Sequence, residues 1–167
     1  MTDFEDALRA RLARNVEFER EREQDERQRQ ADEQAHREAE QRRRREEQGR
    51  RDARHAEMVA HLQGLLAQLE GTATGDFVSR GGWTESGEEF VVKVTSVQLS
   101  PRRSLFVELD RDDDEVLARW TSDVGESIEM WRLLEFTPEM LSELMLRLVD
   151  QELWRDATGP PPFPGAD

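Results

Sequence analysis

Three aspartates at alternate positions form the pattern in this sequence that most resembles a metal-binding motif. Asp110, Asp112 and Asp114 match the D-x-D-x-D start of a calcium-binding loop. Such a loop needs glycine at its sixth position and a bidentate acid at its twelfth, and this chain has Glu115 and Thr121 there. We therefore interpret the segment as an acidic hairpin turn.

The other reactive side chains are few. The chain has no cysteine and no tyrosine, and Lys93 is its only lysine. Its three histidines, His36, His55 and His61, fall in a segment that we expect to be helical, with the imidazoles exposed. Most general bases, nucleophiles and transition-metal ligands are thus missing from the part expected to fold compactly. We expect no catalytic residue, no cofactor and no metal, and so no enzyme.

Basic side chains cluster at Arg42–Arg45. Four consecutive residues point all around a helix, and Glu46 and Glu47 dilute their charge. The 167 residues include 38 acidic and 24 basic side chains, a net charge of −14, which repels phosphates. We do not expect nucleic-acid binding, for which this cluster is the only candidate.

The first 70 residues predict a long charged helix. From residue 17 to residue 54 there is no proline and one glycine, and Glu, Gln, Arg and Ala are strong helix formers. Acid-to-arginine pairs four residues apart recur, as in Glu23–Arg27 and Glu38–Arg42. We predict a single helix or a weak coiled coil over residues 1–70. A disordered, charge-rich arm over residues 19–54 is the alternative.

Apolar residues gather near both ends of this helix. One stripe repeats every four residues near the N-terminus, and a second fits two a/d heptads near residue 60. Two heptads are too few for an isolated coiled coil, so we expect them to pack on a partner helix or on the following domain. With Trp131, which we place on an outward strand face, the candidate partner-binding residues are Phe4, Leu8, Leu12, Met58, Leu62, Leu65, Leu69 and Trp131.

Composition changes near residue 71. Residues 1–70 hold 18 acidic and 15 basic side chains, and the remainder holds 20 and 9. We predict a linker over 71–75, a small acidic α+β domain over 76–156 and a disordered Pro-rich tail over 157–167.

Alternating apolar residues predict about four strands in the small domain. They are expected within residues 90–97, 104–109, 116–120 and 128–136. Glycines around Trp83 read as turns, and Thr137-Pro138-Glu139 predicts the start of a helix. The expected fold class is α+β: a long charged N-terminal helix, then a small antiparallel β-meander packed by a C-terminal helix.

These features favour a cytoplasmic protein that acts by contact. The N-terminus is acidic and no apolar run approaches the roughly 18 residues of a membrane span, so we expect no membrane association. We predict a non-enzymatic adaptor, structural or assembly protein that binds a protein partner and is a monomer or weak homodimer. One alternative is an acidic chaperone-, immunity- or DNA-mimic-like inhibitor that masks a basic partner. The other is a divalent-cation-dependent enzyme that uses the Asp110–Glu115 turn.

Overall fold

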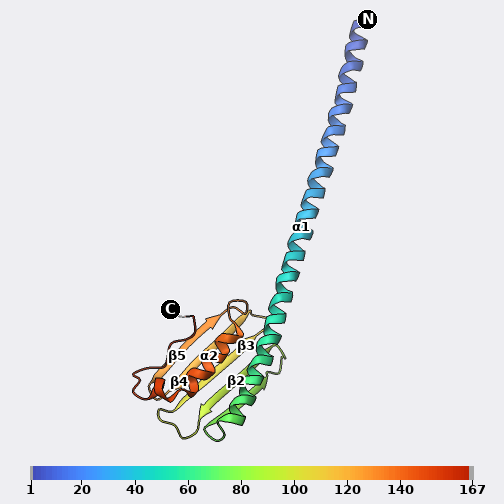
Figure 1. Ribbon diagram of the computed structural model, residues 1–167. Coiled ribbons are helices and arrows are strands. Elements are labelled where there is room, and N and C mark those ends of the chain that lie inside the picture. Colours follow the sequence, from blue (N-terminus) through green and yellow to red (C-terminus); the bar gives the residue numbers. More distant parts are fainter. Residues whose placement is uncertain (1, 166–167) are drawn as a thin grey trace. The chain divides into compact units, whose positions relative to one another are not determined.

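A computed structural model describes residues 2–165 (Figure 1). The chain divides into two units, one that ends at Glu47 and one that begins at Gln48. Helix α1 (Thr2–Thr72) contributes to both units. The compact unit therefore begins inside the helix, and not after residue 71, where the composition changes.

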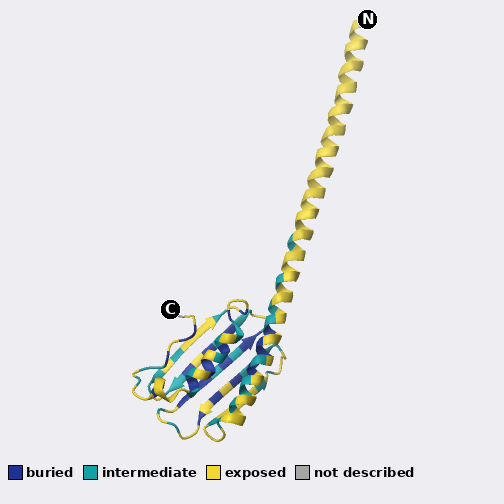
Figure 2. Cartoon of the chain, viewed as in Figure 1, coloured by how far each residue is buried: buried dark blue, intermediate teal, exposed yellow. Residues whose placement is uncertain are grey.

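The first unit is helical, and its described residues other than Glu40 and Glu47 are exposed (Figure 2). Its side chains pair along the helix surface, as in the Arg22–Glu19 ion pair of 2.8 Å and the Arg44–Glu40 ion pair of 3.0 Å. Each such pair stabilises a helix by about 0.2–0.5 kcal/mol. The long N-terminal helix predicted from the sequence is confirmed. Within residues 2–165, no helix carries an apolar stretch long enough to cross a bilayer.

The second unit contains an antiparallel sheet whose strands pair in chain order. The strands are β1 (Phe77–Trp83), β2 (Glu89–Ser96), β3 (Arg103–Asp110), β4 (Glu115–Ser122) and β5 (Gly125–Trp131). Helix α2 (Pro138–Val149) and the short α3 (Gln151–Trp154) follow. The α+β class is confirmed, but the sheet has five strands and not four.

The strand missed by the sequence analysis is β1. Its Gly81 and Gly82 resemble turn residues, yet they pair with Val92 and Val91 of β2. A Cβ atom on Gly81 would lie 2.0 Å from the carbonyl oxygen of Val91. Glycine serves here to let two backbones approach, and not to reverse the chain.

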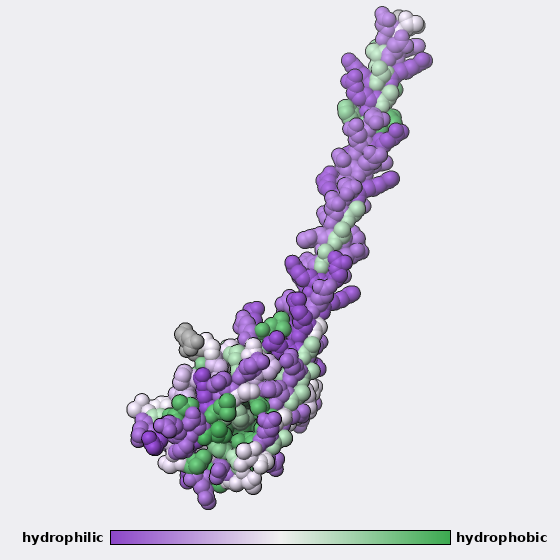
Figure 3. Space-filling model, in the orientation of Figure 1, coloured by the Kyte–Doolittle hydropathy of each residue, from purple (hydrophilic) through white to green (hydrophobic). Residues whose placement is uncertain are grey.

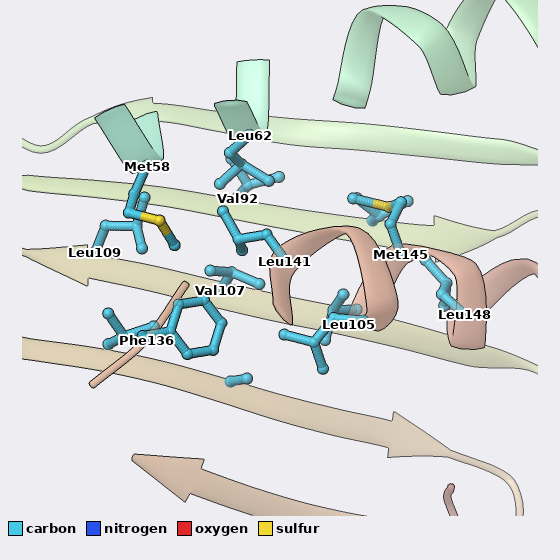
Figure 4. Packing of buried hydrophobic residues seen from close by; sticks show 14 of the residues in the cluster. Met58, Leu62, Val92, Leu105, Val107, Leu109, Phe136, Leu141, Met145 and Leu148 are labelled. Atoms are coloured by element: carbon cyan, nitrogen blue, oxygen red, sulfur yellow. The ribbon is translucent and has the colours of Figure 1, made fainter. Parts of the chain in front are cut away.

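One face of the sheet is covered by the last part of α1 and by α2 (Figures 1 and 4). Met58 and Leu62 of α1 are fully buried, as is Leu144 of α2. The side chain of Thr137 accepts a hydrogen bond from the backbone N–H of Met140 and caps α2, as predicted. The sheet supplies the other half of this core, from Phe90, Val92, Val94, Leu105, Val107, Leu109, Val116, Ala118 and Trp120.

The Pro-rich segment after α3 also joins the core, contrary to the predicted disordered tail. Phe163 is buried, and its ring stacks on that of Trp120 with centroids 6.1 Å apart. Arg147 of α2 donates a hydrogen bond to the carbonyl of Pro162. An aromatic side chain among prolines anchors this segment, because burying it outweighs the small entropy cost of ordering a stiff chain.

A buried arginine links the sheet to the end of α2. The Arg103 Nε atom donates to the carbonyl of Leu148 at 2.8 Å, and Nη1 donates to Gln151 Oε1 at 2.9 Å. Its guanidinium lies 5.2 Å from the Trp154 ring centroid. Burial lowers the pKa of Arg103 from its ordinary value, and the charge of Asp150 partly offsets this effect.

Replacing Gly81 by alanine is expected to destabilise the second unit more than the same change at Gly82. Both residues have positive φ angles, of 150° and 157°, so both variants carry backbone strain of about 1–3 kcal/mol. Only the Gly81 variant adds the clash with Val91. Urea unfolding followed by tryptophan emission measures the difference, and equal losses would contradict the close approach.

Leu62→Ala is expected to lower the free energy of unfolding by about 2–5 kcal/mol, because it leaves a cavity between α1 and the sheet. Leu146→Ala is the matched control, since that leucine is exposed on α2. Its effect is expected within about 0.5 kcal/mol. A Leu62 variant as stable as the control would show that α1 does not belong to this core.

Candidate interaction surfaces

In the part of the chain that the structure describes, strand alternation leaves one face of the sheet without a covering element. On β2, Val92 and Val94 face the helices, so Lys93 and Thr95 point the other way. The open face, as we call this side, consists of the outward residues of all five strands. It comprises Val78, Arg80, Gly82, Glu89, Val91, Lys93, Thr95, Ser104, Phe106, Glu108, Asp110, Glu115, Leu117, Arg119, Thr121, Glu126, Ile128 and Met130.

The strand register aligns cations across this face. Arg80 lies opposite Lys93, which lies opposite Phe106, which in turn lies opposite Arg119. The Arg119 guanidinium sits 5.0 Å from the centroid of the Phe106 ring. We call Arg80, Lys93 and Arg119 the basic row.

Apolar side chains flank the basic row. Ile128 and Met130 of β5 are 57% and 56% exposed, and Val78 of β1 is 49% exposed. Val91 and Leu117 are half-buried between them. A cavity of about 310 Å³ opens beside Val78, Arg80 and Lys93. The open face therefore combines apolar contact, the cations of the basic row and, on either side of that row, the carboxylates of Glu89, Glu108, Asp110, Glu115 and Glu126.

Carboxylates crowd one end of the sheet. Glu89 lies opposite Asp110, which lies opposite Glu115. Oxygen atoms of Glu89, Glu108 and Asp110 lie within 4.8 Å of one another. Burial, reinforced by repulsion from Glu89 and Asp110, raises the pKa of Glu108 above its ordinary value. These three carboxylates are the residues that could hold a divalent cation.

The predicted D-x-D-x-D pattern does not converge on one point. Asp110 accepts hydrogen bonds from the backbone N–H groups of Asp112 and Asp113, both at 3.1 Å, and so shapes the β3–β4 turn. Asp114 instead accepts from the backbone of Leu133 and pairs with Arg51 at 3.5 Å. The carboxylates that do cluster come from β2 and β3, which only the strand register reveals.

A second apolar surface lies between the helices of the second unit. A groove of about 340 Å³ separates α1 from α2, and Leu65, Leu69, Met145, Leu146 and Val149 line it. Figure 3 shows hydrophobic side chains gathered over α2 and the adjoining part of α1.

Ser142 also lines this groove and lies 2.9 Å from His61 Nε2. A serine–histidine contact suggests nucleophilic catalysis, in which the imidazole takes the hydroxyl proton. The Ser142 hydroxyl has the carbonyl of Pro138, at 3.4 Å, as a second hydrogen-bond partner, and its contact with His61 links α1 to α2.

His55 also differs from the sequence-based expectation of an exposed imidazole. It is buried, and its Nε2 atom donates to the carbonyl of Leu109 at 2.9 Å. Because α1 belongs partly to the second unit, that unit contains two histidines, although residues 76–156 contain none. Both imidazoles are engaged in hydrogen bonds to the fold.

The predicted partner-binding residues fall into four groups. Phe4, Leu8 and Leu12 are exposed on the first unit, with Phe4 at 72%. Met58 and Leu62 cover the protein's own sheet and are not available to a partner.

Leu65 and Leu69 are half-buried in the groove wall, and so remain partly accessible. Trp131 was placed on an outward strand face, but it lies on the covered side and packs on Phe136 with ring centroids 4.7 Å apart. The sequence analysis missed the basic row, although the alternation of the predicted strand over residues 90–97 places Lys93 on the side opposite Val92 and Val94.

No protein family, curated protein or solved structure matches the chain.

Glu108→Gln is expected to stabilise the protein at pH 7 by a few tenths to about 1 kcal/mol, because it removes a partly buried carboxylate that neighbouring carboxylates repel across the strands. A carboxyl whose pKa is raised by folding lowers stability where it is ionised, so the gain appears above about pH 4.3. Below that pH the gain is expected to vanish.

Thermal unfolding at pH 4 and pH 7 measures this difference. Glu126→Gln is the control, since its cross-strand neighbour is the uncharged Thr121. A Glu108 gain that is equal at both pH values would contradict the assigned cause.

Proposed function

We propose that this is a non-enzymatic adaptor, structural or assembly protein whose second unit binds another protein through the open face. One observation carries the proposal: the helices cover a single face of the sheet, while the other exposes Ile128 and Met130 of β5 beside the half-buried Leu117 of β4. Open faces of antiparallel sheets are usually polar where they meet water. Neighbouring exposed apolar side chains on such a face instead mark an interaction site.

The first unit supports the same proposal. Its exposed stripe of Phe4, Leu8 and Leu12 offers a second apolar contact on a helix that is otherwise charged. A helix of this kind presents anchors at regular spacing to a groove or to another helix. A protein with two separate contact surfaces suits an adaptor or an assembly component.

The side chains that carry chemistry are engaged in the fold. His55 and His61 each make a hydrogen bond within the second unit, and Ser142 contacts both His61 and the carbonyl of Pro138. The engagement of these side chains in hydrogen bonds within the fold supports a function in protein binding rather than in catalysis.

The acidic end of the sheet favours a second candidate function, the masking of a basic partner. Glu89, Glu108 and Asp110 concentrate negative charge on a unit that carries 23 acidic and 12 basic residues. Binding driven by such a field weakens steeply with salt.

The test uses the tagged full-length chain to capture partners from extracts of its source cells. Ile128→Asp/Met130→Asp places two charges on the open face and is expected to reduce recovery of a specific partner at least about tenfold. Val97→Asp is the control, since that valine is 46% exposed in a loop outside the open face. Unchanged tryptophan emission confirms that the variants fold. A partner recovered equally with all variants would overturn the proposal.

A further inference from the structure

We propose that the open face binds an acidic, partly apolar peptide segment of the partner. The segment's carboxylates would contact the basic row, and its apolar side chains would cover Val91, Leu117 and Met130. This inference rests on the proposed function and adds the chemistry of the partner.

In the described part of the chain, the cations of the basic row make no ion pair, although Glu108 and Glu126 are diagonal neighbours on the open face. Among residues 2–165, no carboxylate lies within 4.0 Å of the cationic groups of Arg80, Lys93 or Arg119. This is unexpected in a unit where acids outnumber bases about two to one. Three cations left unpaired in an acidic molecule are available to an anion from outside.

Two of these cations also oppose each other. Arg80 and Lys93 lie directly opposite on neighbouring antiparallel strands, where like charges destabilise the pair. The cavity of about 310 Å³ beside them gives access to both groups. A carboxylate bound there would relieve the repulsion, so binding and the local stability of β1 and β2 would favour each other.

Phe106, which lies between Lys93 and Arg119, favours a peptide over a nucleic acid as the ligand. Single-stranded nucleic acids bind such sheets by stacking bases on free aromatic faces. Phe106 is the only aromatic side chain on the open face of the described strands, and Arg119 already lies over its ring. A guanidinium held in this way still presents its N–H groups to a carboxylate.

The acidic end of the sheet gives the site a direction. Glu89, Glu108, Asp110 and Glu115 would repel carboxylates at that end, while Leu117 and Met130 beside them accept uncharged side chains. The bound segment must therefore carry its acids on one edge and its apolar residues on the other. A uniformly anionic polymer such as a nucleic acid lacks that asymmetry.

The test measures binding of a fluorescent helical peptide of about 14 residues, built from the repeat Leu-Glu-Glu-Leu-Leu-Glu-Glu, to the full chain by anisotropy. Lys93→Glu/Arg119→Glu is expected to weaken binding at least about tenfold, because each reversal replaces an attraction with a repulsion. Arg102→Glu/Arg155→Glu makes the same change in net charge at exposed positions off the open face. This control is expected to change the affinity less than about twofold.

Other outcomes separate the alternatives. Absence of peptide binding, or equal losses in the two double variants, would overturn the inference. Binding of a thymidine oligonucleotide that the Lys93/Arg119 variant abolishes would assign the face to nucleic acid instead. If the peptide does not bind, but the Ile128→Asp/Met130→Asp variant still recovers less of the captured protein, the proposed function stands and only the proposed chemistry of the partner is wrong. Lys93→Gln/Arg119→Gln replaces the reversal variant if that variant does not fold, and is expected to weaken binding in the same direction.

Discussion

The packing of α1 against the sheet is the contact on which the second unit depends. Met58 and Leu62 come from a helix that precedes the first strand, and they are as deeply buried as the central residues of the sheet. Together with α2 and Phe163 they close one face. Among the described residues of this unit, no further element is left to cover the other face. The open face is thus a direct result of how much apolar helix the chain supplies.

Much of the fold follows from local patterns. Alternation of β-branched and polar residues marked four strands, and the Thr137 cap marked α2, because both signals act between neighbouring residues. Strand β1 escaped, since a glycine pair has the same appearance in a turn and in a close backbone contact. The heptads around Met58 were recognised, but the sequence left open whether they pack on a partner or on the following domain. In the structure, Met58 and Leu62 pack on the sheet of the same chain. Phe163 was missed because prolines around it dominate the composition.

The candidate surfaces were less predictable, because they depend on register. Arg80, Lys93 and Arg119 are far apart in the sequence, and three strand pairings bring them into one row. Strand pairing likewise brings Glu89 together with Glu108 and Asp110. The aspartates of the D-x-D-x-D pattern, which are conspicuous in the sequence, have different partners instead. His55 was expected to be exposed because the domain boundary was drawn at the change in composition. A charge-rich sequence can continue a helix into a core without any change of residue type at the boundary.

The continuity of α1 from Thr2 to Thr72 has a consequence for how its charged part forms. Starting an isolated helix is costly, while extending an existing one is nearly free. The helical turns of α1 that pack on the sheet act as a nucleus, so the residues before Gln48 only have to extend an existing helix. Fraying should begin at the N-terminal turn and proceed inward. Melting of the globular part would remove the nucleus and release the whole charged segment to the coil state.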